Sequence, residues 1–376
     1  MSVLSQGKKL LYLSVYDPHV PIAGAGTRGI KFVENLANFF TVDLIYLEGS
    51  GQKPQPEITK KYQSNLQNVR SKTQIKFTPF DYFLFSQSLY QAAVNKLENN
   101  SYDWLLCDYG LSATYGTILS KKFNIPLIYC SHNIEYLIYW DKGKTDPNRW
   151  ILLPYVYWME KAAVQQSKIL VAISQDDANH YKQYDINPDQ ILVIPQGFDE
   201  LKFNPFYQPP QNNPKIILFC GNYKIQQNRE AVTIVHEQII EKVLAQFPDT
   251  IFRFIGANPP QNIKHPNIEF KGFVEDYPSE LKQADIFISP LIQGRGFPTK
   301  IVEALACGKP TIATPIGARA VDKSYQSLQV CELPDFAEKI CEVLRMNRPV
   351  NSSEFDKLRE QYSWEKNIKV LIDKMN

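Results

Sequence analysis

The residues best suited to chemistry lie in one stretch near position 300 of this 376-residue chain. Gly294 and Gly296 predict a loop, and Thr299 and Lys300 predict the start of a helix. A helix start exposes unpaired N–H groups and partial positive charge, which suit an anion such as a diphosphate. Lys300 adds a full charge there, and Glu303, one turn later, can accept hydrogen bonds from both hydroxyls of a ribose. The stretch therefore predicts a site for a nucleoside diphosphate.

A histidine follows a predicted strand in the first half of the chain. His132 comes directly after the apolar run 126–130, and Asp108 ends another run at 104–107. Ligands of open α/β sheets bind beyond the carboxyl ends of the strands. This position favours a functional role for His132, although an isolated histidine is more often structural. Aspartate and histidine are otherwise too scattered to predict a metal site.

Residues 24–29, Gly-Ala-Gly-Thr-Arg-Gly, match the pattern GxGxxG, and Glu48 lies about 20 residues further along. This spacing is compatible with NAD(P) binding, but the dinucleotide fingerprint needs its first glycine directly after a strand. Here residues 17–23 intervene. A loop with a purely structural role is another interpretation of these residues.

Strand and helix patterns alternate along the chain, which predicts α/β domains with parallel sheets and right-handed crossovers. Continuous apolar runs are typical of strands buried on both faces. We expect strands at residues 9–16, 42–47, 104–107, 126–130, 169–173, 191–194, 215–220, 250–255, 268–270, 286–290 and 311–314. The clearest helical spacings fall at 27–40, 80–97, 115–123, 277–283, 334–345 and 354–375.

Length and composition indicate a globular protein of two domains. The chain is 44% hydrophobic and 21% charged, and its net charge of +2 does not indicate a nucleic-acid partner. Its six cysteines form no CxxC pair and are expected as reduced thiols. The first residues lack a signal-peptide pattern, and no apolar run is long enough to span a membrane. We therefore expect a cytoplasmic protein.

Residues 303–308, Glu-Ala-Leu-Ala-Cys-Gly, resemble part of the donor-site signature of family-4 glycosyltransferases of the GT-B fold. That signature usually reads Glu-Gly-Phe-Gly, four further residues, then Glu-Ala-Met-Ala-x-Gly. Arg295 stands where its first Glu falls. Arg295-Gly296 and Lys300 are similar to one branch of the family, which has Arg-Gly here and Lys three residues before the second Glu. Residues 132–135, 195–199 and 362–364 also resemble family motifs.

The resemblance implies the GT-B fold, with two Rossmann-like domains whose parallel sheets face a cleft. It places an acceptor-side domain at 1–195, a linker at 196–214, a nucleotide-sugar-binding domain at 215–352, and a helix at 353–376 that crosses back to the first domain. The implied reaction moves a sugar from a UDP- or GDP-sugar to a glycan or lipid-linked acceptor. It retains the anomeric configuration and needs no metal ion or cofactor.

The resemblance also implies roles for individual residues. His132, Lys300 and Glu303 are the implied catalytic residues, and His132 points at the donor sugar. The implied donor-binding residues, including a base contact from Phe273 and Val274, are Gly24, Gly26, Gly221, Asn222, Phe273, Val274, Arg295, Gly296, Phe297 and Thr299. Many members have an Arg and a Lys for the diphosphate in the loop after the strand at 215–220. Lys224 and Arg229 are the alternatives in this chain.

Several alternatives stay open. The basic residues at 60–76 predict a solvated face or a surface for an anionic acceptor or lipid headgroup. The aromatic residues at 136–158 predict core packing, an acceptor channel or peripheral contact with a membrane. A GT-B relative that binds a nucleotide sugar without transferring it, such as an epimerase, and an NAD(P)-dependent oxidoreductase are the alternative functions.

Overall fold

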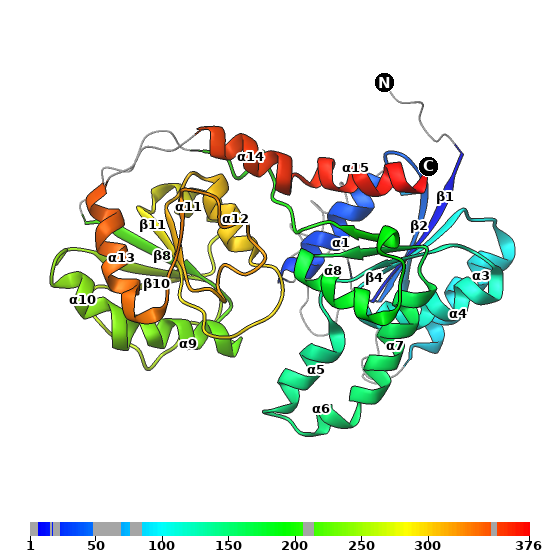
Figure 1. Cartoon of the computed structure of the whole chain (residues 1–376), viewed down its shortest axis with the longest axis horizontal. Coiled ribbons are helices and arrows are strands. Elements are labelled where there is room, and N and C mark those ends of the chain that lie inside the picture. Colours follow the sequence, from blue (N-terminus) through cyan, green and yellow to red (C-terminus); the bar gives the residue numbers. More distant parts are fainter. Residues whose placement is uncertain are drawn as a thin grey trace. The chain divides into compact units, whose positions relative to one another are not determined.

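The structure is a computed structural model that describes residues 7–15, 17, 23–47, 69–75, 85–205, 214–346 and 352–376. The chain forms two compact units (Figure 1). Unit 1 comprises Met1–Gln196 and Trp364–Asn376, and unit 2 comprises Gly197–Ser363. Parts of the predicted basic run and of the predicted linker lie outside the described residues, at 48–68, 76–84 and 207–213. Glu48 is among them.

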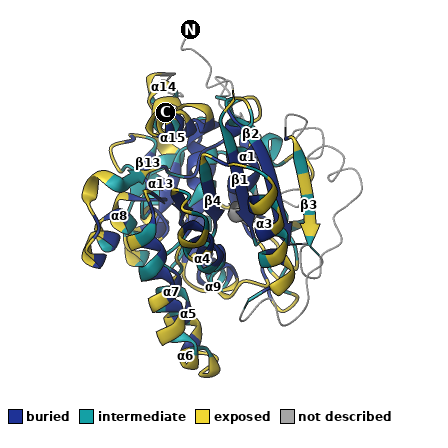
Figure 2. Ribbon diagram, turned by 90° about the vertical axis from the view of Figure 1, so that its right-hand side faces the viewer, coloured by how far each residue is buried: buried dark blue, intermediate teal, exposed yellow. Residues whose placement is uncertain are grey.

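Unit 1 is built on a parallel sheet with the strand order β3-β2-β1-β4-β5-β6-β7. Its strands are β1 (Lys9–Ser14), β2 (Thr41–Leu47), β3 (Ser71–Ile75), β4 (Trp104–Asp108), β5 (Leu127–Cys130), β6 (Ile169–Ala172) and β7 (Ile191–Val193). The central strands are buried on both faces because their apolar runs are continuous, as Figure 2 shows for β1, β2 and β4. The order reverses between β1 and β4, so ligands are expected beyond the carboxyl ends of these two strands.

Helices cover the sheet of unit 1. They are α1 (Ala23–Leu36), α3 (Gln87–Asn99), α4 (Ala113–Phe123), α5 (Glu135–Gly143), α6 (Asn148–Ile151), α7 (Leu153–Gln166), α8 (Gln175–Tyr181) and α15 (Trp364–Met375). Helix α15 packs on α1, where the ring of Trp364 meets that of Phe32 edge to face. Buried Ile368 and Leu371 of α15 join the same core. The end of the chain is therefore part of the core of unit 1.

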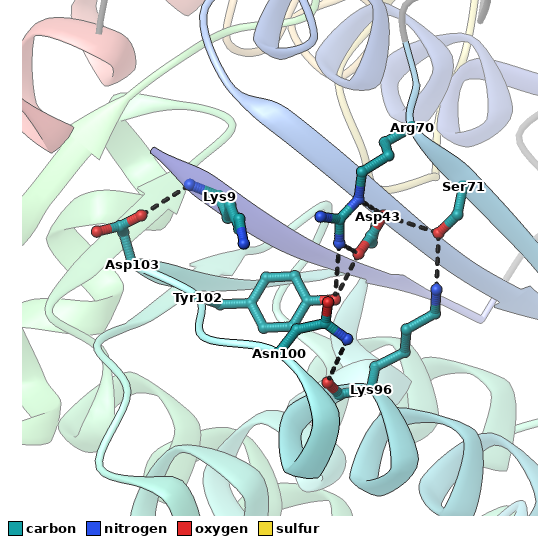
Figure 3. Close-up of polar contacts among 8 residues, drawn as sticks. All are labelled: Lys9, Asp43, Arg70, Ser71, Lys96, Asn100, Tyr102 and Asp103. Atoms are coloured by element: carbon teal, nitrogen blue, oxygen red, sulfur yellow. Dashed lines mark hydrogen bonds and ion pairs between the residues drawn. The ribbon is translucent and has the colours of Figure 1, made fainter. Parts of the chain in front are cut away.

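A buried carboxylate ties the edge of this sheet together (Figure 3). Asp43 of β2 accepts hydrogen bonds from Arg70, Ser71 and Tyr102. Burial raises the pKa of Asp43, but these hydrogen bonds outweigh it and hold the pKa at about 2. Arg70 belongs to the basic run of the sequence, so at least this cation serves the fold.

Unit 2 is built on a second parallel sheet with the order β10-β9-β8-β11-β12-β13. Its strands are β8 (Ile216–Cys220), β9 (Ile251–Ile255), β10 (Ile268–Gly272), β11 (Ile286–Ser289), β12 (Thr311–Ala313) and β13 (Leu328–Val330). Its helices are α9 (Gln226–Ile234), α10 (Ile240–Leu244), α11 (Tyr277–Gln283), α12 (Thr299–Ala306), α13 (Leu333–Met346) and α14 (Ser352–Tyr362). The prediction of two α/β units with parallel sheets is confirmed.

Two expectations about local structure were wrong. Gly24 and Gly26, expected in a loop, lie in the first turn of α1. Packing of the buried Ile30 and Val33 of this helix on the sheet outweighs the low helix propensity of glycine. The single helix expected at 354–375 is two helices, α14 and α15, with a break at Ser363. At this break the Phe198 N–H donates a hydrogen bond to the carbonyl oxygen of Tyr362 over 3.1 Å, so this oxygen is paired outside the helix.

Candidate functional site

The first turn of α12 lies where the strand order of unit 2 reverses, between β8 and β11. The Lys300 Nζ donates a hydrogen bond to the carbonyl oxygen of Cys220, the last residue of β8, over 2.6 Å. Open α/β sheets bind ligands at such a switch point. The lysine predicted to meet a diphosphate is therefore at the edge of the sheet where a ligand is expected.

Glu303 lies one turn further along the same helix and has an unusual environment for a carboxylate. Desolvation raises its pKa to about 7, although the charges of Lys300 and Lys202 lower it. Because its pKa lies near 7, the Glu303 carboxyl group is partly ionised at neutral pH. The ionised form can accept hydrogen bonds from ligand hydroxyls. The structure thus places Lys300 and Glu303 one turn apart on α12.

Three glycines let the loops at this edge approach one another closely. A Cβ on Gly256, whose φ is +131°, would lie 1.9 Å from the carbonyl oxygen of Gly221. A Cβ on Gly221 would lie 2.7 Å from the side-chain carbon of Asn228, and one on Gly294 would lie 2.4 Å from Gln227 Oε1. The loops after β8, β9 and β11 therefore approach their neighbours closely. At Gly256 the neighbour is backbone, and that contact only glycine permits.

Two arginines shape these loops through hydrogen bonds to the backbone. Arg319 donates from Nε and Nη2 to the carbonyl oxygen of Gly296, both over 3.2 Å. Arg229 donates from Nη1 to the carbonyl oxygens of Tyr223 at 3.1 Å and Lys224 at 2.8 Å. Lys224 and Arg229, the two alternatives for a diphosphate-binding cation in this loop, are both exposed, and Arg229 is the one whose side chain contacts the loop backbone.

The other predicted donor-binding residues of unit 2 are spread along the same edge of the sheet. Asn222 accepts hydrogen bonds from the Lys224 N–H at 3.0 Å and from Asn258 at 3.1 Å. Phe273 follows β10 and is 65% exposed, and Val274 packs against the core beneath α12.

The rest of the loop before α12 is partly covered. Arg295 is exposed, whereas the ring of Phe297 packs on that of Tyr362, with centroids 5.8 Å apart. Thr299 is the first residue of α12, and its N–H bonds the carbonyl oxygen of Phe297. Phe297 therefore anchors the loop.

Unit 1 holds a buried histidine–carboxylate pair at the carboxyl ends of its central strands. His132, two residues after β5, has its Nε2 2.7 Å from Oδ1 of Asp108, the last residue of β4. Both side chains are 4% exposed. The ring of Tyr109, a non-glycine residue at φ +75°, meets the His132 ring edge to face. Asp108 can fix the tautomer and orientation of His132.

A fully buried arginine lies near this pair. Arg28 Nη1 donates to the carbonyl oxygen of Pro195 over 3.3 Å, and its guanidinium lies over the Phe32 ring. Nε and Nη2 of Arg28 have no partner among the described residues. A Cβ on Gly29 would lie 2.9 Å from Asp108 Oδ2, so α1 closely approaches the pair. Gly24 and Gly26 lie at the start of that helix.

Sequence reasoning missed Asp108 and Arg319 as parts of the site. Asp108 ends a predicted strand, which was the available signal, but its contact with His132 depends on how β4 and β5 pair. Arg319 lies 23 residues from the backbone oxygen that it binds, and no local pattern indicates that contact.

Among the described residues, no group of three or more His, Cys, Asp or Glu side chains is arranged to hold a metal ion. Within the same part of the chain, no helix has the length and apolar character needed to cross a bilayer.

Comparison with known proteins agrees with this geometry. Residues 22–200 match the family described as Glycosyltransferase Family 4, and residues 214–346 match that described as Glycosyl transferases group 1. The fold resembles that of Alr3699/HepE from Anabaena in complex with UDP, with a TM-score of 0.70 and 15% identity over 98% of this chain and 99% of that one. The two parallel sheets and this likeness define a GT-B fold.

Curated relatives are similar over shorter stretches. A phosphatidyl-myo-inositol mannosyltransferase of Mycolicibacterium smegmatis is 25% identical over 40% of this chain and 41% of its own length. An Escherichia coli UDP-Gal:alpha-D-GlcNAc-diphosphoundecaprenol alpha-1,3-galactosyltransferase is 24% identical over 58% of this chain and 59% of its own length. The chain thus matches less than two thirds of either relative. With both family matches together extending over most of its residues, it belongs to the family-4 glycosyltransferases.

Proposed function

We propose that this protein transfers a sugar from a nucleotide-diphosphate sugar to a glycan or lipid-linked acceptor, with retention of configuration and without a metal ion. The observation that carries the proposal is the position of Lys300, in the first turn of α12 and at the switch point of the unit 2 sheet. The proposed donor is a UDP-sugar, in keeping with the UDP bound to HepE. The names of the two curated relatives give a lipid, phosphatidyl-myo-inositol, and a lipid-linked sugar, GlcNAc-diphosphoundecaprenol, as acceptors.

The proposed chemistry relies on charge. Breaking the bond between the sugar and the diphosphate leaves negative charge on the departing phosphate oxygen. The Lys300 ammonium and the N–H groups at the start of α12 stabilise that charge as it develops, with Arg295 as a further cation. Glu303 holds the ribose hydroxyls, which positions the diphosphate on the helix start. In unit 1, His132 is proposed to contact the donor sugar, oriented by Asp108.

The first experiment identifies the ligand. Thermal-shift and calorimetric titrations with UDP, GDP, ADP, NAD and NADP should show stabilisation by a nucleoside diphosphate. Donor consumption is then followed by NMR, with and without acceptor, and the coupling constant of the product's anomeric proton reports its configuration. Stabilisation by NAD or NADP alone would favour an oxidoreductase. A nucleotide sugar that binds but is only epimerised, or is never consumed, would favour a non-transferring relative.

A further inference from the structure

Three helices of unit 1 form an arm whose surface is unusually apolar. The arm consists of α5, α6 and α7, which pack on one another, and Figures 1 and 2 show α5 and α6 extending away from the sheet of unit 1. Its inner face is ordinary core, with Tyr139, Val156 and Met159 buried. The rest of its surface, which we call the outer face, carries five of the fourteen exposed large apolar side chains among the described residues: Trp140, Trp150, Ile151, Tyr155 and Trp158.

The outer face combines these side chains with cations. Ile151 is 76% exposed and Trp158 is 63% exposed, and the Lys161 ammonium lies 5.3 Å from the Trp158 ring centroid. The Trp140 and Trp150 rings lie 5.8 Å apart. The charged residues of the arm that are at least partly exposed are four cations, at 142, 144, 149 and 161, and two anions, at 141 and 146, which leaves a net charge of +2. The two anions form ion pairs with Lys144 and Arg149. Burial raises the pKa of Glu135 to about 8 and that of Glu160 to about 7, so these two buried carboxyl groups offset the positive charge only in part near neutral pH.

This combination fits one class of partner. Tryptophan and tyrosine favour the boundary between lipid tails and water, because their rings are apolar while their N–H and O–H groups need polar partners. Lysine and arginine beside such rings are attracted to anionic lipid headgroups. We propose that the arm is the surface by which this protein docks on an anionic lipid bilayer. The choice of a lipid partner rests on the proposed function, in which the acceptor can be lipid-linked.

The arm is separate from the proposed donor site of unit 2 and from the His132–Asp108 pair of unit 1. It carries none of the residues assigned to the donor, and its exposed rings lie on α5 to α7, beyond the strand ends that hold Asp108 and His132. Docking would hold the enzyme where a lipid-linked acceptor is concentrated. Binding to lipid and turnover of the donor are therefore separable properties of the same chain.

The test is sedimentation of the full chain with vesicles, in the absence of a donor. We expect binding to vesicles of equimolar phosphatidylcholine and phosphatidylglycerol, weaker binding at high salt, and little binding to phosphatidylcholine alone. The double variant Ile151→Ser/Trp158→Ser should lower the affinity roughly tenfold or more. Lys144→Glu/Lys161→Glu should have a similar effect, since each charge reversal acts directly on the attraction to the headgroups.

Matched controls lie outside the arm. Leu201 is 92% exposed in unit 2, so Leu201→Ser removes a comparable apolar side chain. Lys121→Glu/Lys122→Glu makes the same charge change at the exposed end of α4. Both controls should bind vesicles like the wild type. Every variant should unfold close to the wild-type temperature, because the changed side chains are at least partly exposed and surface substitutions change stability little.

Three results would overturn the proposal. The wild type could remain in the supernatant with anionic vesicles, or the arm variants could sediment as the wild type does. In the third, the wild type does not bind vesicles, and analytical ultracentrifugation shows that it is a dimer whereas the arm variants are monomers. The arm would then be a protein interface.

Donor hydrolysis measured without vesicles should be equal in wild type and arm variants. A wild type with no such turnover would count against the proposed function and leave the docking result unaffected.

Discussion

The Lys300 ammonium group donates a hydrogen bond to the carbonyl oxygen of Cys220, joining the first turn of α12 to the carboxyl end of β8. A neutral carbonyl holds this charge in place without neutralising it, so the charge remains available to an anion. In the proposed function, this pair holds the charge at the switch point of the unit 2 sheet, where the donor diphosphate binds.

Replacing Lys300 with alanine is expected to lower kcat by roughly a hundredfold to a thousandfold, because a positioned charge that stabilises the leaving diphosphate is lost. The measurement is steady-state turnover with the donor identified by titration. Lys264→Ala removes an exposed lysine elsewhere in unit 2 and should leave kcat unchanged. Near-normal turnover in Lys300→Ala would show that the proposed mechanism is wrong.

The stability of the free protein should depend on the ionisation of Glu303. Its pKa is raised from 4.5 to about 7 on folding, so the folded state holds the proton more tightly than the unfolded state does. Ionisation therefore costs stability: the cost is absent at acid pH, grows between the two pKa values, and is complete above pH 7. Glu303→Gln should remove this cost and be about 1–3 kcal/mol more stable than the wild type at alkaline pH.

Urea unfolding at about pH 5 and about pH 8 measures this difference. The two proteins should be closer in stability at the lower pH. A constant difference between them at both pH values would mean that Glu303 is not the titrating group. Loss of donor affinity in Glu303→Gln, measured by calorimetry, separately tests the proposed contact with the ribose.

Asp108→Asn should lower kcat/KM by roughly tenfold to a hundredfold and change the pH dependence of the rate, because the amide no longer stabilises the same tautomer of His132. A double-mutant cycle separates this role from simple packing. In the His132→Ala background, Asp108→Asn should have little further effect on the rate. If the two effects multiplied instead, Asp108 would act independently of the histidine.

Gly256→Ala should destabilise unit 2 through its backbone. The position combines a φ of +131° with a Cβ contact of 1.9 Å to the Gly221 carbonyl oxygen, so both strain and a clash arise. Gly272 is a matched control, since its φ is +68° but an added Cβ would meet nothing within 4 Å. We expect Gly256→Ala to cost at least about 2 kcal/mol more than Gly272→Ala in chemical denaturation. Equal costs would mean that the loops after β8 and β9 separate easily.

Local patterns in the sequence were sufficient for most of the sheet framework. Strands such as β1 and β8 are buried on both faces, so they need continuous apolar runs, and such runs are visible without a structure. The short edge strands β3 and β13 were missed, because β3 alternates partly buried with exposed residues and β13 has only three residues. The exposed tryptophans of α5 to α7 could not be separated from core residues, because aromatic composition alone does not indicate which face a side chain occupies.

The sequence by itself determined that Lys300 and Glu303 share the first turns of a helix after a glycine-rich loop, because their spacing is local and helix geometry is general. It also determined the two α/β units, through the alternation of apolar runs and amphipathic segments. Only the tertiary structure decided that Lys300 reaches Cys220 and that Asp108 meets His132. The second contact exists because β4 and β5 pair in a register that sets Asp108 beside Cys130, and pairing between distant segments depends on the packing of the whole sheet.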